Sequence, residues 1–142
     1  MSDGDTLWVQ PTSGGAAVNI RIDAIDAPEI CQAWGPEAKA ALSARVLHQT
    51  VHVNGKRRDG FGRLLARVRV HDSASPTDVG QTMVAGGHAW AHQYKNYKSV
   101  YGADQQQAQA ARRGLFAQAK AQHPRDFRQR HGPCEHKSGK VK

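Results

Sequence analysis

Carboxylates crowd the first 29 residues of a chain that is otherwise basic. The five acids of this stretch are Asp3, Asp5, Asp23, Asp26 and Glu29. They stand against a single base, Arg21, although the 142-residue chain carries a formal net charge of +8. Carboxylates this close repel one another unless a cation lies among them, and oxygen ligands favour the hard cations calcium, magnesium and manganese. Aspartates also cap turns by accepting hydrogen bonds from nearby backbone N–H groups, so both explanations stay open at this point.

The acids lie at the ends of predicted strands. Thr6–Val9 has the composition of a short strand. Side chains alternate between apolar and polar over residues 18–23, which predicts a half-buried strand. Asp26 does not fit that alternation, and a proline follows it at position 28. We therefore expect the strand to bulge or end near Ala24 and Ile25.

The rest of the chain has signals for both helices and strands. Two further strands are expected, over Thr50–Val53 and Arg63–Val70. The dipeptide Asn54-Gly55 is typical of a hairpin turn. Three helices are expected, beginning at Pro36, covering residues 76–87, and running from residue 103 to a stop at Gly114. The pattern indicates an α+β fold of antiparallel strands with three helices.

Length and composition predict one soluble domain, which we expect to be a monomer. With 142 residues, 39% of them hydrophobic and 23% charged, the chain can bury a core without help from metals or disulfides. No apolar run approaches the roughly 18 residues of a membrane span, so we expect no membrane partner. The start MSDGDTLWVQ has neither the basic region nor the apolar core of a signal peptide, and the sequence assigns no compartment.

Basic charge is concentrated near the C-terminus. Residues 110–142 hold nine Lys and Arg residues against Asp126 and Glu135. We therefore divide the chain into a domain over residues 1–127 and a basic tail over residues 128–142. Such a tail attracts polyanions such as nucleic acids. The alternative is a solvated terminus that aids solubility.

Four motifs follow one another in an order and at spacings that resemble those of one enzyme family. They are DGDT at residues 3–6, RIDAIDAPE at 21–29, DGFGR at 59–63 and QAQAARRGLF at 107–116. From Ser2 to about Phe127, the chain resembles the thermonuclease, or staphylococcal nuclease-like, family. The resemblance implies a five-stranded OB-fold β-barrel with three helices, and a truncated first strand because the chain begins two residues before DGDT. It also implies a calcium-dependent endonuclease that hydrolyses phosphodiester bonds of DNA and RNA.

Five side chains match functional positions of that family. The resemblance implies that Asp5 and Asp26 bind calcium. It also implies that Arg21 and Arg63 are the catalytic arginines and that Glu29 is the catalytic glutamate. The chemistry agrees, because a planar guanidinium can donate two hydrogen bonds to one phosphate. A carboxylate on the exit turn can act as general base for the attacking water.

Two alternatives compete with catalysis. In the first, Arg21 and Arg63 only neutralise Asp23 and Glu29. In the second, the chain is a catalytically inactive OB-fold module that binds nucleic acid, as in relatives that have lost site residues. Retention of all five matched side chains favours the enzyme over the module.

Aromatic and basic residues outside this centre suit contact with nucleic acid. Phe61 and the glycine before it stand where the family has a tyrosine and a lysine, which predicts a weaker grip on a terminal phosphate. Tyr94 and Tyr97 flank Lys95 where relatives pack a nucleotide base, and stacking contributes about 1–3 kcal/mol per base. Packing of these tyrosines on the barrel is the alternative. Trp90 is expected in the core.

The chain contains two cysteines, Cys31 and Cys134. In an oxidising compartment they would form a disulfide that ties the basic tail to the active-site loop, whereas a reducing cytosol would keep both as thiols. A zinc site made of His131, Cys134 and His136 is a weaker alternative, because its spacing matches no common zinc motif well.

Overall fold

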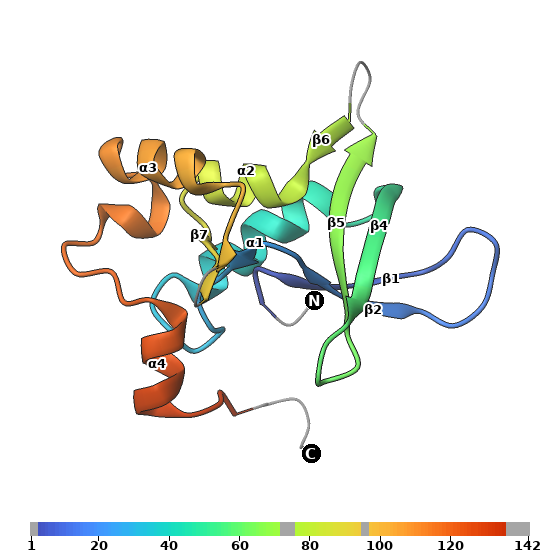
Figure 1. Ribbon diagram of the computed structural model, residues 1–142, viewed down its shortest axis with the longest axis horizontal. Helices are drawn as coiled ribbons and strands as arrows, with labels where there is room; N and C mark the ends of the chain where they lie inside the picture. The colour runs from blue at the N-terminus through green and yellow to red at the C-terminus, as the bar shows by residue number, and fades with distance from the viewer. Residues whose placement is uncertain (1–2, 72–75, 95–96, 136–142) are drawn as a thin grey trace.

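Figure 1 shows a computed structural model of the protein, which describes residues 3–71, 76–94 and 97–135. Its largest element is a five-stranded sheet in the order β1-β2-β5-β4, with β6 also paired to β5. The strands are β1 Thr6–Val9, β2 Val18–Ile22, β4 Val51–Arg58, β5 Leu64–His71 and β6 Pro76–Asp78. β2 and β5 run parallel, and the other neighbouring strands are antiparallel.

Short strand pairs and helices surround this sheet. The short strands are β3 Ile25–Asp26, which pairs with β7 Trp90–Ala91, and β8 Gln93–Tyr94, which pairs with β9 Tyr97–Lys98. The helices are α1 Gly35–Val46, α2 Val79–Ala85, α3 Gly102–Ala110 and α4 Pro124–His131, with a 3₁₀ turn over Gly114–Ala117. In the part of the chain that the structure describes, no helix is long and apolar enough to cross a membrane.

The alternation of β2 decides which of its side chains enter the core. Ile20 and Ile22 are buried, and Arg21 between them faces the opposite side. Leu42 of α1 and Val68 of β5 belong to the same hydrophobic cluster. Burying each such side chain stabilises the fold by about 1.5–3 kcal/mol. This core fixes the ends of β1, β2 and β3, which carry the polar residues of interest.

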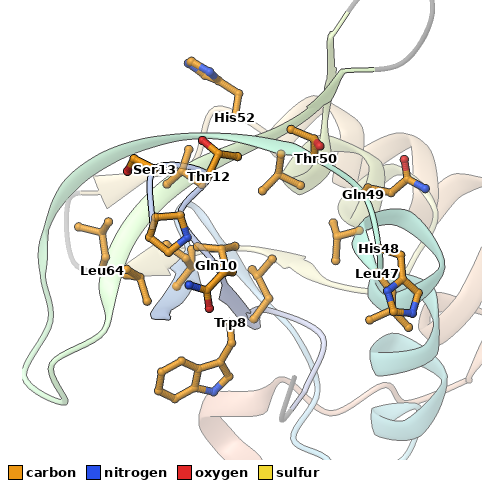
Figure 2. Close-up of a pocket in the computed structure, with 18 residues that line it drawn as sticks. Trp8, Gln10, Thr12, Ser13, Leu47, His48, Gln49, Thr50, His52 and Leu64 are labelled. Carbon is orange, nitrogen blue, oxygen red and sulfur yellow. The ribbon is translucent and has the colours of Figure 1, made fainter. Parts of the chain in front are cut away.

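The sheet does not close into a barrel within the described residues. β1 and β4 stand at the two ends of the strand order and do not pair with each other. A cavity of about 540 Å³ lies beside both strands, lined by residues that include Trp8, Leu47 and His52 (Figure 2). The mixed α+β class and a sheet of five strands agree with the expected fold, whereas the expected barrel closure is not seen.

The hairpin expected at Asn54-Gly55 is wrong. Both residues lie inside β4, and the register shifts between Gly55 and Arg57. A Cβ at Gly55 would come within 3.0 Å of Leu64 Cδ2, so this glycine makes room for a packed side chain instead of a turn. The chain turns later, over residues 59–62, where Gly62 adopts a φ of +80°.

The second and third expected helices are shorter than the sequence indicates. Residues 76–78 form β6, and Asp78 then caps α2 by accepting a hydrogen bond from the Gln81 N–H at 3.2 Å. The third helix ends at Ala110, and Gly114 begins the 3₁₀ turn. Trp90 is partly buried and packs against a second hydrophobic cluster, where its ring meets that of Phe116 at a centroid distance of 4.9 Å.

A fourth helix, α4, corrects the expected number of three for the described residues. It begins at Pro124, whose fixed φ suits the first position of a helix. The boundary that we drew between residues 127 and 128 falls inside α4, and Figure 1 shows this helix apart from α3 and from the β4–β5 pair.

Candidate active site

Asp5 is held by the tight turn that leads into β1. Its buried carboxylate accepts hydrogen bonds from Thr6 Oγ1 at 3.1 Å and from the Ala27 N–H at 2.9 Å. The Asp5 N–H donates to Asp3 Oδ1 at 3.2 Å. Turn capping therefore accounts for Asp3, one of the crowded acids, whereas the Asp5 carboxylate faces inward.

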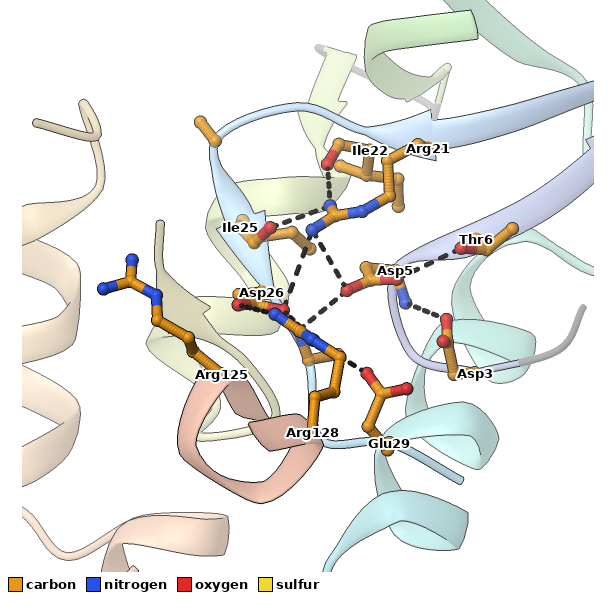
Figure 3. Close-up of polar contacts among 12 residues, drawn as sticks. Asp3, Asp5, Thr6, Arg21, Ile22, Ile25, Asp26, Glu29, Arg125 and Arg128 are labelled. Atoms are coloured by element: carbon orange, nitrogen blue, oxygen red, sulfur yellow. Dashed lines mark hydrogen bonds and ion pairs between the residues drawn. The ribbon is translucent and has the colours of Figure 1, made fainter. Parts of the chain in front are cut away.

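Arg21 extends from β2 into the space between two acids (Figure 3). Its Nη1 donates to the carbonyl oxygens of Ile22 at 2.6 Å and Ile25 at 2.8 Å. Its Nη2 lies 3.5 Å from Asp5 Oδ2 and 3.7 Å from Asp26 Oδ1. The two backbone contacts fix the guanidinium plane, so the charge of Arg21 stays between the two carboxylates.

Asp26 reaches the same place because the chain changes direction after β2. Ala24 adopts a φ of +73°, which separates β2 from β3. β3 then pairs with β7, where Asp26 lies opposite Trp90. The expected break near residues 24 and 25 is confirmed, and it directs the Asp26 carboxylate into the interior, where it is buried.

Glu29 stands on a compact turn between β3 and α1. Its N–H donates to Gln32 Oε1 at 3.0 Å, and its carbonyl accepts from the Gln32 N–H at 2.8 Å. At the start of α1, Gly35 packs so closely that a Cβ there would lie 2.0 Å from the Glu29 carbonyl oxygen. These contacts hold the Glu29 backbone in the turn that follows β3, the strand that carries Asp26.

Arg128 of α4 is a site residue that the sequence reasoning missed. Its Nη1 lies 2.9 Å from Glu29 Oε2, across 99 positions of sequence. Its two amino groups also lie 3.4 and 3.3 Å from the oxygens of Asp26. Pro124 followed by a basic run signals a helix here. No local pattern connects that helix to the acids.

The side chains of Asp5, Arg21, Asp26, Glu29 and Arg128 form one charged cluster. Arg63 lies at the edge of this cluster, just before β5. Its Nε donates to Asp59 Oδ2 at 2.8 Å, and its Nη1 donates to Thr6 Oγ1 at 3.4 Å. The same Thr6 hydroxyl donates to Asp5, so Arg63 reaches the cluster through Thr6. The ring of Phe61 lies 5.3 Å from the Arg63 guanidinium carbon.

The ion pairs differ from the simple neutralisation considered from the sequence. Asp23 pairs with Lys56 at 3.0 Å and Arg67 at 3.3 Å. Glu29 pairs with Arg128. Within the described residues, the alternative in which the two matched arginines neutralise Asp23 and Glu29 is therefore wrong.

Burial and charge shift the titration of these acids in different directions. Burial, reinforced by the charge of Asp5, raises the pKa of Asp3 to about 8. Burial also raises the pKa of Glu29, although Arg128 partly offsets that effect. Burial acts on Asp5 too, but the Arg21 guanidinium and the hydrogen bonds outweigh it and lower the pKa of Asp5. Further positive charge would therefore stabilise the ionised cluster.

A divalent cation would meet two buried carboxylates here. Across residues 3–71, 76–94 and 97–135, no three His, Cys, Asp or Glu side chains converge to form a metal site. Asp5 and Asp26 nevertheless offer hard oxygen donors that face the same nitrogen of Arg21. Calcium combines carboxylate oxygens with water and carbonyl oxygens. The donor set fits a cation that takes its remaining ligands from water or substrate.

The structure describes only part of the expected nucleic-acid contacts. Phe61 is 86% exposed on the turn over residues 59–62. Tyr94 and Tyr97 stand opposite each other in the β8–β9 pair. Lys95 lies outside the described residues. The contact of these four residues with nucleic acid stays a prediction.

A disulfide joins Cys31 to Cys134, with their Cα atoms 5.8 Å apart. It connects the turn after Glu29 to the segment that follows α4. Because the Cys134 sulfur is bonded in this way, it does not serve the zinc site considered from the sequence. His136, the third member of that set, lies outside the described residues.

Comparison with known proteins places the chain in a family. Residues 19–118 match the family model described as staphylococcal nuclease homologue. A Haemophilus influenzae protein named an uncharacterized endonuclease is 34% identical over 90% of this chain and 69% of its own length. An Escherichia coli protein with the same name is 36% identical over 82% of this chain and 73% of its own. A micrococcal nuclease from Shigella flexneri is 32% identical over 89% of this chain and 75% of its own. The chain belongs to the staphylococcal nuclease family.

Proposed function

We propose that the protein is a calcium-dependent endonuclease that hydrolyses phosphodiester bonds of DNA and RNA. The observation that carries this proposal is the position of Arg21, whose guanidinium lies between the buried carboxylates of Asp5 and Asp26. Guanidinium groups match the geometry of phosphate, and paired carboxylates suit a hard cation. The nuclease names of the relatives support the same reaction class.

In this proposal Asp5 and Asp26 hold the calcium ion. When bound, the ion would supply Lewis-acid polarisation of the substrate phosphate. Hydrogen bonds from Thr6 and Ala27 orient the Asp5 carboxylate in advance. The pairing of β3 with β7 does the same for Asp26. Pre-oriented donors lower the ordering cost of binding.

Arg21 and Arg63 would bind the phosphate from two directions. Two carbonyl oxygens orient Arg21, and Asp59 orients Arg63 through its Nε. Attack by water increases the negative charge on the phosphoryl oxygens. Donors fixed before the reaction stabilise that charge without reorganising.

Glu29 would accept the proton of the attacking water. Its carboxylate is partly exposed, so water can reach it. Burial raises its pKa, which makes it a stronger base than an exposed glutamate. The ion pair with Arg128 uses Oε2, and we assign the water to the other carboxylate oxygen.

A second candidate function is a nucleic-acid-binding module without catalysis. The observation that favours it is Arg128, which contacts both Asp26 and Glu29. If Arg128 stayed on both acids, it would compete with the cation at one and hinder water at the other. Cleavage of nucleic acid separates this module from the enzyme.

The test is cleavage of a supercoiled plasmid and of a labelled RNA by the purified full chain. We expect both substrates to be cut in calcium, spared in excess chelator, and spared by Arg21→Ala. Arg69→Ala is the matched control. Arg69 lies opposite Asp78 of β6, near the end of β5, whereas the site is near the start of β5 at Leu64. Binding without cleavage in calcium would favour the module. Full cleavage in chelator would remove the cation from the proposal.

A further inference from the structure

Helix α4 places the guanidinium of Arg128 on the acid that we assign to calcium. Its Nη1 lies 3.4 Å from Asp26 Oδ1, and its Nη2 lies 3.3 Å from Asp26 Oδ2 (Figure 3). One side chain therefore contacts both oxygens of that carboxylate. The Arg128 side chain is 42% exposed and the Asp26 side chain is 2% exposed, so Arg128 covers a buried acid from the solvent side.

A cation at Asp26 and the guanidinium of Arg128 need the same oxygen atoms. Both are positively charged, and like charges a few ångströms apart repel strongly where water is partly excluded. Binding of the cation therefore requires Arg128 to leave at least one Asp26 oxygen. Glu29 gives it a place to go, because Arg128 Nη1 already lies 2.9 Å from Glu29 Oε2.

Contacts beyond those of Arg128 help to hold α4 and its flanking segments in position. They include the Cys31–Cys134 disulfide, a 2.6 Å hydrogen bond from Gln32 Nε2 to the Gln122 carbonyl, and a hydrogen bond from Arg125 to the Gln93 carbonyl. The disulfide is the covalent one. It joins the segment beyond the end of α4 to the turn that follows Glu29, so it restrains the helix on the side of the acids.

We propose that Arg128 sets the cation affinity of this site by competing with the divalent ion for Asp26, and that the Cys31–Cys134 disulfide keeps it in competition. The inference rests on the proposed function, since it needs a cation at Asp26. Linkage makes the effect reciprocal: the factor by which Arg128 weakens cation binding equals the factor by which the cation weakens the Arg128 contact. The disulfide-bonded chain therefore binds the cation more weakly than the reduced chain.

A purely structural role for Arg128 predicts a different change in calcium affinity. If Arg128 only secured α4, its removal would loosen the site and leave calcium affinity unchanged or lower. Competition predicts that removing Arg128 tightens calcium binding. The direction of the change in calcium affinity therefore distinguishes the two roles without reference to cleavage activity.

Calorimetric titration of calcium into the full chain at one ionic strength tests the competition. We expect Arg128→Ala to bind calcium about 5–10-fold more tightly than the parent, within the usual range of coupling between sites. Arg128→Gln, which keeps a polar side chain without the charge, should show the same gain. Arg130→Ala removes the same charge from an exposed position on α4 and should stay within about twofold, because screening weakens exposed charges. Circular dichroism checks that each variant is folded.

The role of the disulfide is tested in the parent and in Arg128→Ala. Replacing Cys31 and Cys134 by serine should tighten calcium binding in the parent, and should change the affinity of Arg128→Ala by less than about twofold, because the two changes act through one contact. The inference is wrong if Arg128→Ala binds calcium no more tightly than Arg130→Ala. An equal gain from the serine substitutions in both backgrounds overturns the role of the disulfide. Failure of the parent and of Arg128→Ala both to bind calcium and to cleave would instead refute the proposed function.

Discussion

The two arginines that touch Asp26 are held in different ways. Arg21 is 14% exposed, projects from β2 and donates hydrogen bonds to two backbone carbonyls. Arg128 is 42% exposed, comes from α4 and contacts carboxylates. Arg21 thus projects from the main sheet, whereas Arg128 projects from a helix that is distant in sequence. We call Arg21 the fixed arginine because backbone carbonyls hold it, and Arg128 the exchangeable arginine because our proposal has it leave Asp26 when a cation binds.

The largest effect is expected at Glu29, which pairs with the exchangeable arginine. Glu29→Gln should lower the cleavage rate by about 10²–10⁴-fold, the usual contribution of a general base. DNA affinity should stay equal or rise slightly, because the change removes a negative charge. Single-turnover cleavage and binding at one salt concentration measure both quantities.

Glu37→Gln on the exposed first turn of α1 is the matched control for Glu29 and should cleave like the parent. If Glu29→Gln cleaves within about threefold of the parent, far less than the loss of a general base, the role assigned to Glu29 is wrong. A fall in DNA affinity together with intact cleavage would make Glu29 a binding residue.

The next effect tests the fixed arginine against the exchangeable one. Arg21→Ala should lower cleavage by about 10²–10³-fold, as removal of one transition-state donor does. It should also lower the free energy of unfolding by about 3–5 kcal/mol, because Asp5 and Asp26 are buried and lose a partner. Arg128→Ala should lower the free energy of unfolding by less than about 1 kcal/mol, since the ion pairs of Arg128 are partly exposed. Denaturant unfolding compares the two, and equal losses would remove the distinction.

The position of Arg21 can be predicted from the sequence, whereas that of Arg128 cannot. Alternation over residues 18–23 predicts β2 and the direction of Arg21, and the broken parity at Asp26 predicts the change of direction after it. These are local signals, carried by a few neighbouring side chains. The contact between Arg128 and Glu29 spans 99 positions and depends on how α4 docks, so no periodicity contains it.

Tertiary packing also overrides one strong local signal. Asn54-Gly55 favours a hairpin by its backbone preferences, yet Leu64 packs against Gly55 and the strand continues to Arg58. The motif DGFGR carries the turn instead, because the Asp59 carboxylate accepts hydrogen bonds from the backbone N–H groups of Phe61 and Arg63. The DGFGR motif therefore contains the turn as well as Arg63.

A third prediction concerns the tether of the exchangeable arginine. Replacing Cys31 and Cys134 by serine should lower the free energy of unfolding by about 2–4 kcal/mol, because the bond closes a long loop in the unfolded chain. Cleavage at saturating calcium should stay within about twofold, since Arg128 has then already left Asp26. Urea unfolding and cleavage kinetics measure the two effects. Collapse of cleavage at saturating calcium would show that the disulfide builds the catalytic centre itself.

The smallest effect is expected in the pH dependence of cleavage. Glu29 acts as a base only when ionised, so the rate should rise with pH through its pKa. Burial raises that pKa, and the ion pair with Arg128 partly offsets the rise. The titratable and charged groups that act on Glu29 include Asp3, Asp5, Asp26 and Arg128. Of these, only Arg128 favours the ionised form, and its removal should raise the pKa of Glu29 further.

The acid limb of the pH profile of Arg128→Ala should therefore move to higher pH, while the rate above the limb stays unchanged. Profiles are compared at saturating calcium, so that the change in cation affinity does not enter, with Arg130→Ala as the charge control. A limb that coincides with that of Arg130→Ala would mean that Arg128 leaves Glu29 as well as Asp26 when the cation binds. Arg128 would then be an exchangeable charge at both acids, and Arg21 would be the one arginine of the pair that stays with the carboxylates throughout the reaction.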